Sequence, residues 1–161
     1  MIIAHAPAGY LLSKVFPKSW QTKGVVSATI IGSFAPDFDF IFNILRLSNL
    51  NHRFFITHTP FFWIVSYSIA LIINKKVHVN SLWIHGFFIG TLLHIALDIP
   101  TGIRVLYPFS DSVTNWFPLV YSSRLSVIQT LLHPYVLAEI GIIVLMLLLV
   151  IIQRLPRPKI T

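Results

Sequence analysis

The feature that most constrains this chain is its longest apolar run, residues 134–153, PYVLAEIGIIVLMLLLVIIQ. A helix of about 20 predominantly apolar residues crosses the hydrocarbon core of a bilayer. Comparable runs lie at 24–45, 59–74 and 81–100, and a shorter one lies at 2–13. Because lipid offers the backbone no hydrogen-bond partner, such runs must be helical. The sequence therefore predicts an all-α fold, a polytopic membrane helical bundle of about four to five spans.

Two of these runs predict irregular spans. Pro36 lies in the middle of the run at 24–45. Proline inside a helix removes a backbone hydrogen bond, so this span should be kinked or broken. The run at 2–13 is short, and we expect a partial or tilted span there.

The composition supports a membrane protein. Charged residues make up 11% of the 161 residues, against about 25% in soluble domains. We therefore expect one integral membrane domain over residues 1–161. Residues 101–133, rich in aromatic residues, Pro and Ser, predict an interfacial loop with a short amphipathic helix near its end. The first residues, MIIAHAPAGYLLSKVF, lack the basic leading region and the cleavage site of a removable signal peptide.

The formal charge of +7 raises the question of nucleic-acid binding. The basic residues lie singly or in pairs at the ends of the apolar runs, not along one helix face. That distribution is typical of topology signals and headgroup anchors. We therefore expect the lipid bilayer, and no nucleic acid, as the partner of this chain.

The same cations predict the orientation. With the N-terminus outside, the cytoplasmic side receives Lys14, Lys18, Lys23, Lys75, Lys76, Arg154, Arg157 and Lys159, and the external side receives Arg46, Arg53, Arg104 and Arg124. This arrangement agrees with the positive-inside rule, and the reverse arrangement would invert it. We expect a multi-pass protein of the inner (cytoplasmic) membrane with a cytoplasmic C-terminus.

The few acidic residues then fall mostly at one depth. An intramembrane carboxylate is costly unless it is paired or bound to a metal ion. His94 precedes Asp98 by one helical turn, so both side chains lie on one face. On this topology, histidines and acids from other runs reach the same external side, whereas His78 and His85 lie towards the cytoplasmic face.

Imidazole and carboxylate are the ligands that zinc takes when no thiolate is present, and the chain has no cysteine. A bound cation would also offset the charge of the buried carboxylates. We therefore predict a divalent metal site, with zinc as the first choice, whose candidate ligands are His5, Asp37, Asp39, His52, His58, His94 and Asp98.

Simpler roles compete with this prediction. A single histidine on an apolar helix is more often a hydrogen-bonded packing residue, which is our interpretation of His78 and His85. Asp37 and Asp39 are also suited to cap a helix that restarts after Pro36. A pair of His and Asp four residues apart is by itself weak evidence for a metal site.

The segments IAHAPAGYLL, GSFAPDFDF, NHRFFITHT, GTLLHIALDIPT and YPFS follow in this order. Together they resemble the YdjM-type family of predicted inner-membrane, metal-dependent hydrolases. The shared pattern is an early His, a Pro-Asp-x-Asp, a His-Arg before a Thr-His, and a Gly-x-x-x-His-x-x-x-Asp. The resemblance covers residues 5–110 and implies a membrane-bound metal-dependent hydrolase.

A more remote similarity is to zinc-dependent phospholipase C. It implies a main site made of Asp37 or Asp39, His58, His94 and Asp98, with His5 at a second ion. The phospholipase's later His-x-x-x-Glu motif is absent, because His133 and Glu139 are six residues apart. A complete centre of three metal ions is therefore not implied.

The predicted function is hydrolysis of an ester or phosphoester in an amphiphilic substrate, such as a lipid, at the external membrane interface. A metal ion there would activate water. Asp37 or Asp39, if not bound to metal, is a candidate general base, and Arg53 is a candidate to hold a phosphate or to anchor at the headgroups. Two alternatives remain open. One is a proton or metal-ion transporter or channel, and the other is a non-catalytic membrane protein with a structural metal site.

Overall fold

The computed structural model describes residues 3–45, 47, 51–116 and 127–155. Its α-helices are α1 His5–Val15, α2 Lys23–Phe34, α3 Phe40–Ile44, α4 Pro60–Val77, α5 Ser81–Asp98, α6 Val127–Leu131 and α7 Pro134–Arg154. Short 3-10 turns connect them: η1 Lys18–Trp20, η2 Ala35–Asp39, η3 His52–Phe54, η4 Ile56–His58 and η5 Ile99–Thr101. Within the described residues there is no strand, only an isolated bridge between Ile103 and Thr114. The predicted all-α membrane bundle is confirmed.

Three segments of the described chain are long and apolar enough to cross a membrane: Lys23–Ile44, Ser81–Thr101 and Pro134–Arg154. They correspond to three of the predicted spans. The predicted spans at 2–13 and 59–74 form α1, with 11 residues, and α4, with 18 residues. Neither of these helices is among the three segments, so the bundle combines full spans with shorter or more polar helices.

The first span is broken where the sequence predicts it. Helix α2 ends at Phe34, the next turn winds as a 3-10 helix, and α3 begins at Phe40. Pro36 lies in the first turn of this 3-10 segment, where its missing N–H is tolerated. The break changes the winding over Asp37 and Asp39, so the two carboxylates reach different nitrogens of His58, Nε2 and Nδ1 respectively.

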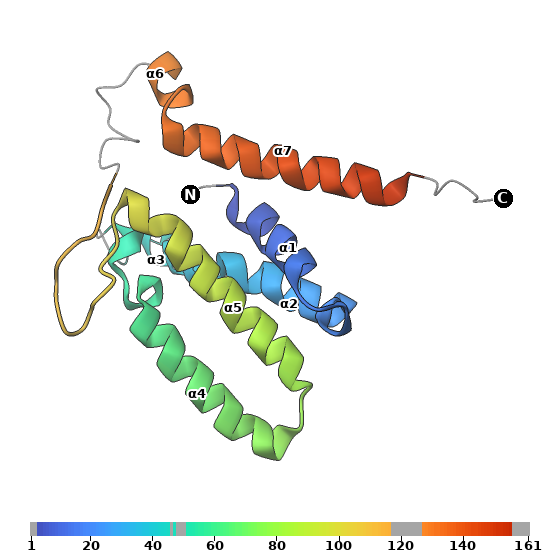
Figure 1. Ribbon diagram of the computed structural model, residues 1–161. Helices are drawn as coiled ribbons and strands as arrows, with labels where there is room; N and C mark the ends of the chain where they lie inside the picture. Colours follow the sequence, from blue (N-terminus) through green and yellow to red (C-terminus); the bar gives the residue numbers. More distant parts are fainter. Residues whose placement is uncertain (1–2, 46, 48–50, 117–126, 156–161) are drawn as a thin grey trace.

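Helix α5 packs along α2, α1 packs on α2, and α4 lies beside α5, with α7 crossing above α1 (Figure 1). The contact between α2 and α5 is close because glycines line it. A Cβ added at Gly90 would lie 2.2 Å from the carbonyl oxygen of Thr29, and one at Gly32 would lie 2.0 Å from that of Phe87. Small residues allow such close approach of helices in membranes. This contact fixes α5 against the end of α2.

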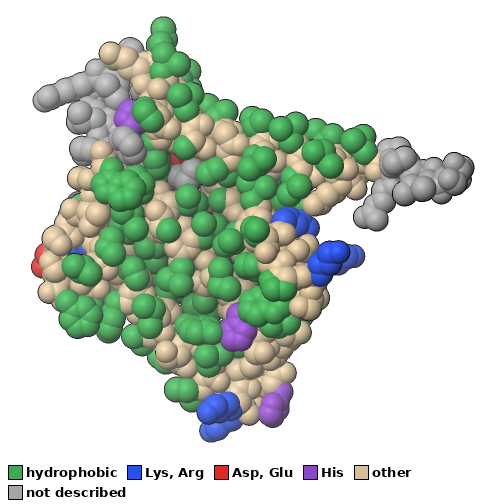
Figure 2. Space-filling model, viewed as in Figure 1, with side chains coloured by type: hydrophobic (Ala, Val, Ile, Leu, Met, Phe, Trp, Pro, Cys, Tyr) green, Lys and Arg blue, Asp and Glu red, His purple; other side chains and the backbone are tan. Residues whose placement is uncertain are grey.

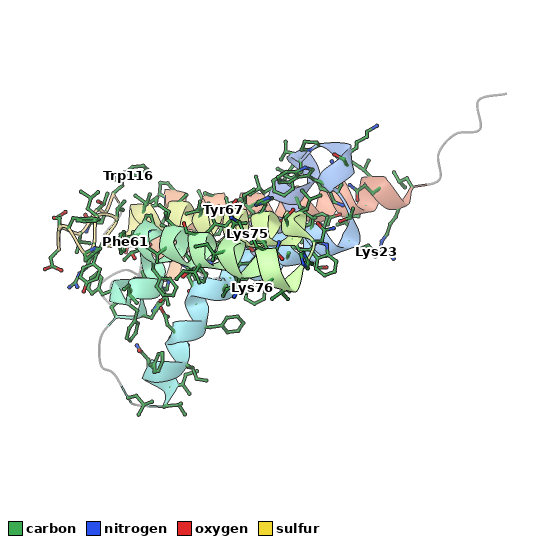
Figure 3. The ribbon with its side chains drawn as sticks, turned by 90° about the horizontal axis from the view of Figure 1, so that it is seen from below. Lys23, Phe61, Tyr67, Lys75, Lys76 and Trp116 are labelled. Carbon is green, nitrogen blue, oxygen red and sulfur yellow. The ribbon has the colours of Figure 1, made fainter. Side chains whose placement is uncertain are left out.

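The antiparallel order brings the N-terminus of α1, the C-terminus of α5 and the N-terminus of α7 to one end of the bundle (Figure 1). Lysines and arginine mark the other ends of the helices: Lys14, Lys18, Lys23, Lys75, Lys76 and Arg154. Figure 2 shows Lys and Arg side chains at the edges of a largely hydrophobic surface. Figure 3 shows Phe61 and Trp116 at the end opposite Lys23.

The predicted interfacial loop is partly described. Residues 103 and 114 form the bridge, and α6 is a short helix near the end of the loop, as predicted. Residues 117–126 lie outside the described part of the chain. Four cations used in the orientation argument, Arg46, Arg124, Arg157 and Lys159, also lie outside it.

We expect Gly90→Ala to lower the free energy of unfolding by about 1–3 kcal/mol, because the new methyl group overlaps the backbone of α2. The matched control is Gly141→Ala on α7, where an added Cβ meets no atom within 4 Å. The control should be neutral or stabilising by up to about 1 kcal/mol, from helix propensity. Thermal unfolding of the detergent-solubilised variants measures both effects, and equal stability of the two variants would contradict the close α2–α5 contact.

Candidate metal centre

Four side chains from three segments converge at the end of the bundle described above. Asp37 comes from the 3-10 turn after α2, His58 from η4 before α4, and His94 and Asp98 from the last turns of α5. The Nε2 atom of His94 lies 3.3 Å from Nε2 of His58, 3.6 Å from Oδ1 of Asp37 and 3.7 Å from Oδ2 of Asp98. The distance from His58 Nε2 to Asp37 Oδ1 is 3.5 Å.

These separations suit a tetrahedral zinc site. Zinc–ligand bonds of about 2.0–2.1 Å in tetrahedral geometry separate the ligand atoms by about 3.3–3.4 Å. The three pairs among Asp37, His58 and His94 measure 3.3–3.6 Å. The pair of His94 and Asp98 is slightly wider. The atoms of Asp37, His58 and His94 are thus close to the spacing at which one cation contacts all three, whereas Asp98 belongs to a second group around His94.

Both imidazoles are held by their other nitrogen. His94 Nδ1 lies 2.9 Å from the carbonyl oxygen of Ser33, and a carbonyl only accepts, so Nδ1 carries the proton. His58 Nδ1 lies 3.0 Å from Asp39 Oδ2, which also accepts a hydrogen bond from the Thr57 hydroxyl. Such bonds fix the tautomer and orientation of metal-binding histidines. In these neutral tautomers both Nε2 lone pairs face the carboxylates.

The centre of the cluster therefore consists of acceptor atoms only. Lone pairs and carboxylate oxygens that face one another away from water repel unless a cation or a proton lies between them. Asp39, Asp98, His58 and His94 are all buried, with side-chain exposures of 0–2%. The donor set and its burial fit a divalent cation.

His58 lies before α4, outside the three candidate spans. Burial alone would lower the pKa of His58, but its hydrogen bonds to the carboxylates of Asp37 and Asp39 outweigh burial and raise the pKa to about 9. In the absence of metal, a proton therefore occupies this position at neutral pH.

His5 lies behind the cluster at the start of α1. Its ring stacks on that of His94, with centroids 3.8 Å apart and planes at 18°. Its Nδ1 is 3.5 Å from Asp37 Oδ2, and its Nε2 is 3.5 Å from Asp98 Oδ1. Both nitrogens are buried, and among the described residues neither has a hydrogen-bond partner. His5, His94 and Asp98 form a second group with metal-ligand spacing. Asp37 and Asp98 each turn one carboxylate oxygen toward His5 and the other toward His94.

His52 lies at the rim of the cluster, with Nε2 3.9 Å from Asp37 Oδ1. Burial and the positive charges of His58 and Arg53 lower the pKa of His52. A lowered pKa keeps the imidazole neutral and able to bind a metal ion at neutral pH. Asp37 and His52 have side-chain exposures of 33% and 27%, so the cluster opens on their side.

The structure separates two predicted residues from the ligand positions. Asp39 caps no helix with its side chain and lies behind His58, where it orients the ring. Arg53 is buried, with Nε 3.6 Å from Asp98 Oδ2, and is not at the surface as a headgroup anchor would be. The predicted site residues thus fall into two groups: those whose atoms face the centre of the cluster, and those that orient or neutralise these residues from behind.

Three supporting groups were not predicted from the sequence. The Tyr135 hydroxyl, at the start of α7, lies 3.0 Å from the carbonyl oxygen of Leu97 and 3.4 Å from Asp98 Oδ1. Thr57 and the carbonyl of Ser33 are the other two. A polar aromatic residue at the site-side end of the last span was the available signal for Tyr135, whereas a backbone carbonyl leaves no trace in the sequence.

Comparison with known proteins gives one informative match. A family model described as "YdjM inner membrane protein" matches residues 1–157. Neither the curated proteins nor the solved structures contain a match to the chain. The matched range extends beyond the motifs at residues 5–110 and includes all of α7.

The proton on His58 predicts how zinc binding depends on pH. Zinc needs the neutral imidazole, so its binding must release the proton at any pH below about 9. We expect the apparent zinc affinity to fall by about tenfold per pH unit between pH 8 and pH 6. Calorimetric titration in buffers of different ionisation enthalpy measures the affinity and the released protons. A pH-independent affinity without proton release would contradict this arrangement.

Proposed function

The chain belongs to the YdjM inner membrane protein family, and we propose that it is a metal-dependent hydrolase of that membrane. The observation that carries this proposal is the cluster of acceptor atoms from Asp37, His58, His94 and Asp98 at the end of the spans. Zinc is the proposed metal, because imidazole nitrogen and carboxylate oxygen are among its common ligands.

The charges around the cluster support a divalent ion. Asp37, Asp39 and Asp98 contribute three negative charges, and the Arg53 guanidinium beside Asp98 offsets one of them. With neutral histidines, two negative charges remain in a largely buried site. One divalent cation neutralises them, which removes most of the cost of burying the carboxylates.

The shape of the cluster favours catalysis over a purely structural role. A structural zinc site is closed by protein ligands, whereas a catalytic one keeps a position open to water or substrate. His58, His94 and Asp98 are sealed from solvent, but Asp37 and His52 are partly exposed. Water and substrate would enter on this side.

Each residue of the cluster would then have a separate role in hydrolysis. His94 would hold the metal with His58 and Asp37 or with His5 and Asp98, the two groups that have ligand spacing. When bound, the metal lowers the pKa of a coordinated water and stabilises negative charge on the attacked group. Asp37, at the open side, would complete the ligand set or accept the proton of the attacking water. Asp39 would hold the ring of His58, and His52 would contact the substrate at the rim.

We propose an ester or phosphoester of an amphiphilic molecule, such as a lipid, as the substrate. The cluster lies at the ends of membrane-crossing helices, where the headgroup of an amphiphile would lie. Basic residues gather at the opposite helix ends, which under the positive-inside rule would place the cluster on the external side and the C-terminus in the cytoplasm.

A structural metal site is the second candidate. Asp37, His58 and His94 come from different segments, so one ion would also join the ends of three parts of the bundle. Removing such an ion would unfold the protein. For a transporter, the described residues offer less support, since the acceptor cluster is confined to one end.

The decisive experiment compares purified wild type with His94→Ala and Asp98→Asn. We expect both variants to lose bound zinc by elemental analysis and to lose hydrolysis of phosphoester and phospholipid substrates by at least about 100-fold. His85→Ala is the control for the zinc measurement alone, because His85 bonds Tyr67 away from the cluster and this variant should keep its zinc.

The two candidates predict different stabilities. If the ion is catalytic, the variants should unfold within a few degrees of wild type, whereas a structural ion predicts loss of the folded state. Wild type purified without chelator and found free of metal would end both proposals.

A further inference from the structure

A second feature of the bundle is an apolar pocket between α4 and α5. It has a volume of about 370 Å³, within the range of about 300–1,000 Å³ for small-molecule pockets. Its walls are Trp20, Trp63, Ile64, Tyr67, His85, Phe88, Ile89 and Leu92. No residue proposed above to bind metal lines this pocket.

The pocket lies at a depth where the surrounding medium is hydrocarbon. Along α5 the rise of about 1.5 Å per residue places its lining, from Leu92 to His85, about 9 to 20 Å from Asp98. Half the thickness of a bilayer core is about 15 Å. If Asp98 lies near the interface at the end of the span Ser81–Thr101, the pocket begins within one leaflet and extends past the middle of the bilayer.

Three polar groups of the walls are already bonded to protein atoms. The Tyr67 hydroxyl and His85 Nδ1 are 2.7 Å apart, and Trp63 Nε1 donates to the carbonyl oxygen of Thr57 at 2.6 Å. The remaining lining is aliphatic or aromatic. A saturated or isoprenoid chain is therefore a suitable occupant, because it asks for no hydrogen bond.

A chain of hydrogen bonds links one wall residue of the pocket to the metal centre. Trp63 bonds the carbonyl of Thr57, the hydroxyl of Thr57 donates to Asp39, and Asp39 holds Nδ1 of His58. Three contacts thus lead from the pocket to a proposed metal ligand. Figure 3 shows Tyr67, from the pocket, further along α4 than Phe61, which lies near the site end.

We propose that this pocket holds the hydrocarbon chain of the amphiphile whose headgroup reaches the metal centre, an inference that rests on the proposed hydrolase function. Transfer of a chain from bilayer to pocket gains little hydrophobic free energy, since both are apolar. The gain is in orientation: a chain fixed between α4 and α5 holds its headgroup near the ligands.

The test uses a dodecyl phosphate with a photoreactive diazirine in its chain. Full-length protein with zinc, in nanodiscs of dioleoyl phosphatidylcholine, is irradiated with this probe, and the adducts are mapped by mass spectrometry. We expect adducts on the pocket residues of α4 and α5, and we expect excess unlabelled dodecyl phosphate to displace them.

Leu92→Trp should fill the pocket and reduce this labelling by at least about fivefold. The matched control is Leu145→Trp on α7, since both leucines are exposed, at 43% and 57%, and Leu145 does not line the pocket. Ile64→Trp fills the pocket from the α4 side and serves if Leu92→Trp does not elute as a monodisperse species.

Two results would overturn the proposal: adducts spread evenly over the lipid-facing helices, and labelling unchanged when the pocket is filled. Labelling does not depend on turnover. Pocket-specific labelling without hydrolysis would therefore support chain binding in the pocket and contradict the hydrolase function. Hydrolysis together with unchanged labelling in Leu92→Trp would support the hydrolase function and contradict chain binding in the pocket.

Discussion

Acceptor atoms that face one another away from water are the constraint on which the rest of this structure depends. The Nε2 lone pairs of His58 and His94 and the carboxylates of Asp37 and Asp98 meet within 3.3–3.7 Å. In a chain with so few charges, such a group would be strongly destabilising unless a positive charge joins it. Without metal, the proton on His58 supplies that charge, and the carbonyl oxygen of Ser33 fixes the orientation of His94.

The close contact of α2 and α5 both packs the bundle and sets the chemistry of the cluster. Gly90 lets α5 approach the backbone of α2, and one helical turn later His94 meets the carbonyl oxygen of Ser33 at 2.9 Å. That carbonyl fixes the proton on Nδ1 and so turns the Nε2 lone pair toward the carboxylates. The close approach of α5 to α2 at Gly90 thus determines both the helix packing and the tautomer of His94. A larger residue at position 90 would prevent this approach.

Much of this arrangement follows from periodicity and could be predicted. The apolar runs give the helices, Pro36 gives the break after Phe34, and helical spacing puts His94 and Asp98 on one face. The sequence could not predict that Asp37 faces the centre of the cluster while Asp39 orients the ring of His58, since this difference depends on the 3-10 winding between α2 and α3.

Contacts between distant segments were likewise beyond the sequence. Tyr135 meets Asp98 across 37 positions, and Arg53 turns inward beside the same carboxylate. Neither contact follows from a local pattern, because each depends on how complete helices are placed in the bundle. The sequence could nominate the polar residues at one depth, but their division into central atoms and supports is a property of the packing.

The asymmetry of the cluster bears on what it does. On one side, His5 stacks on His94 and the Tyr135 hydroxyl approaches Asp98, so protein atoms close the site. On the other side, Asp37 and His52 keep about a third and a quarter of their side-chain surface exposed. A site built only to join helices gains nothing from an open side, since exposure weakens the electrostatic interaction it relies on. An open side next to a buried ligand set is what a reaction with an external molecule requires. Hydrogen bonds through Trp63 and Thr57 link a wall of the apolar pocket between α4 and α5 to this cluster. The proposed substrate, with a polar head and a hydrocarbon chain, would use both the cluster and the pocket, whereas a free ion or a soluble ester would use only one.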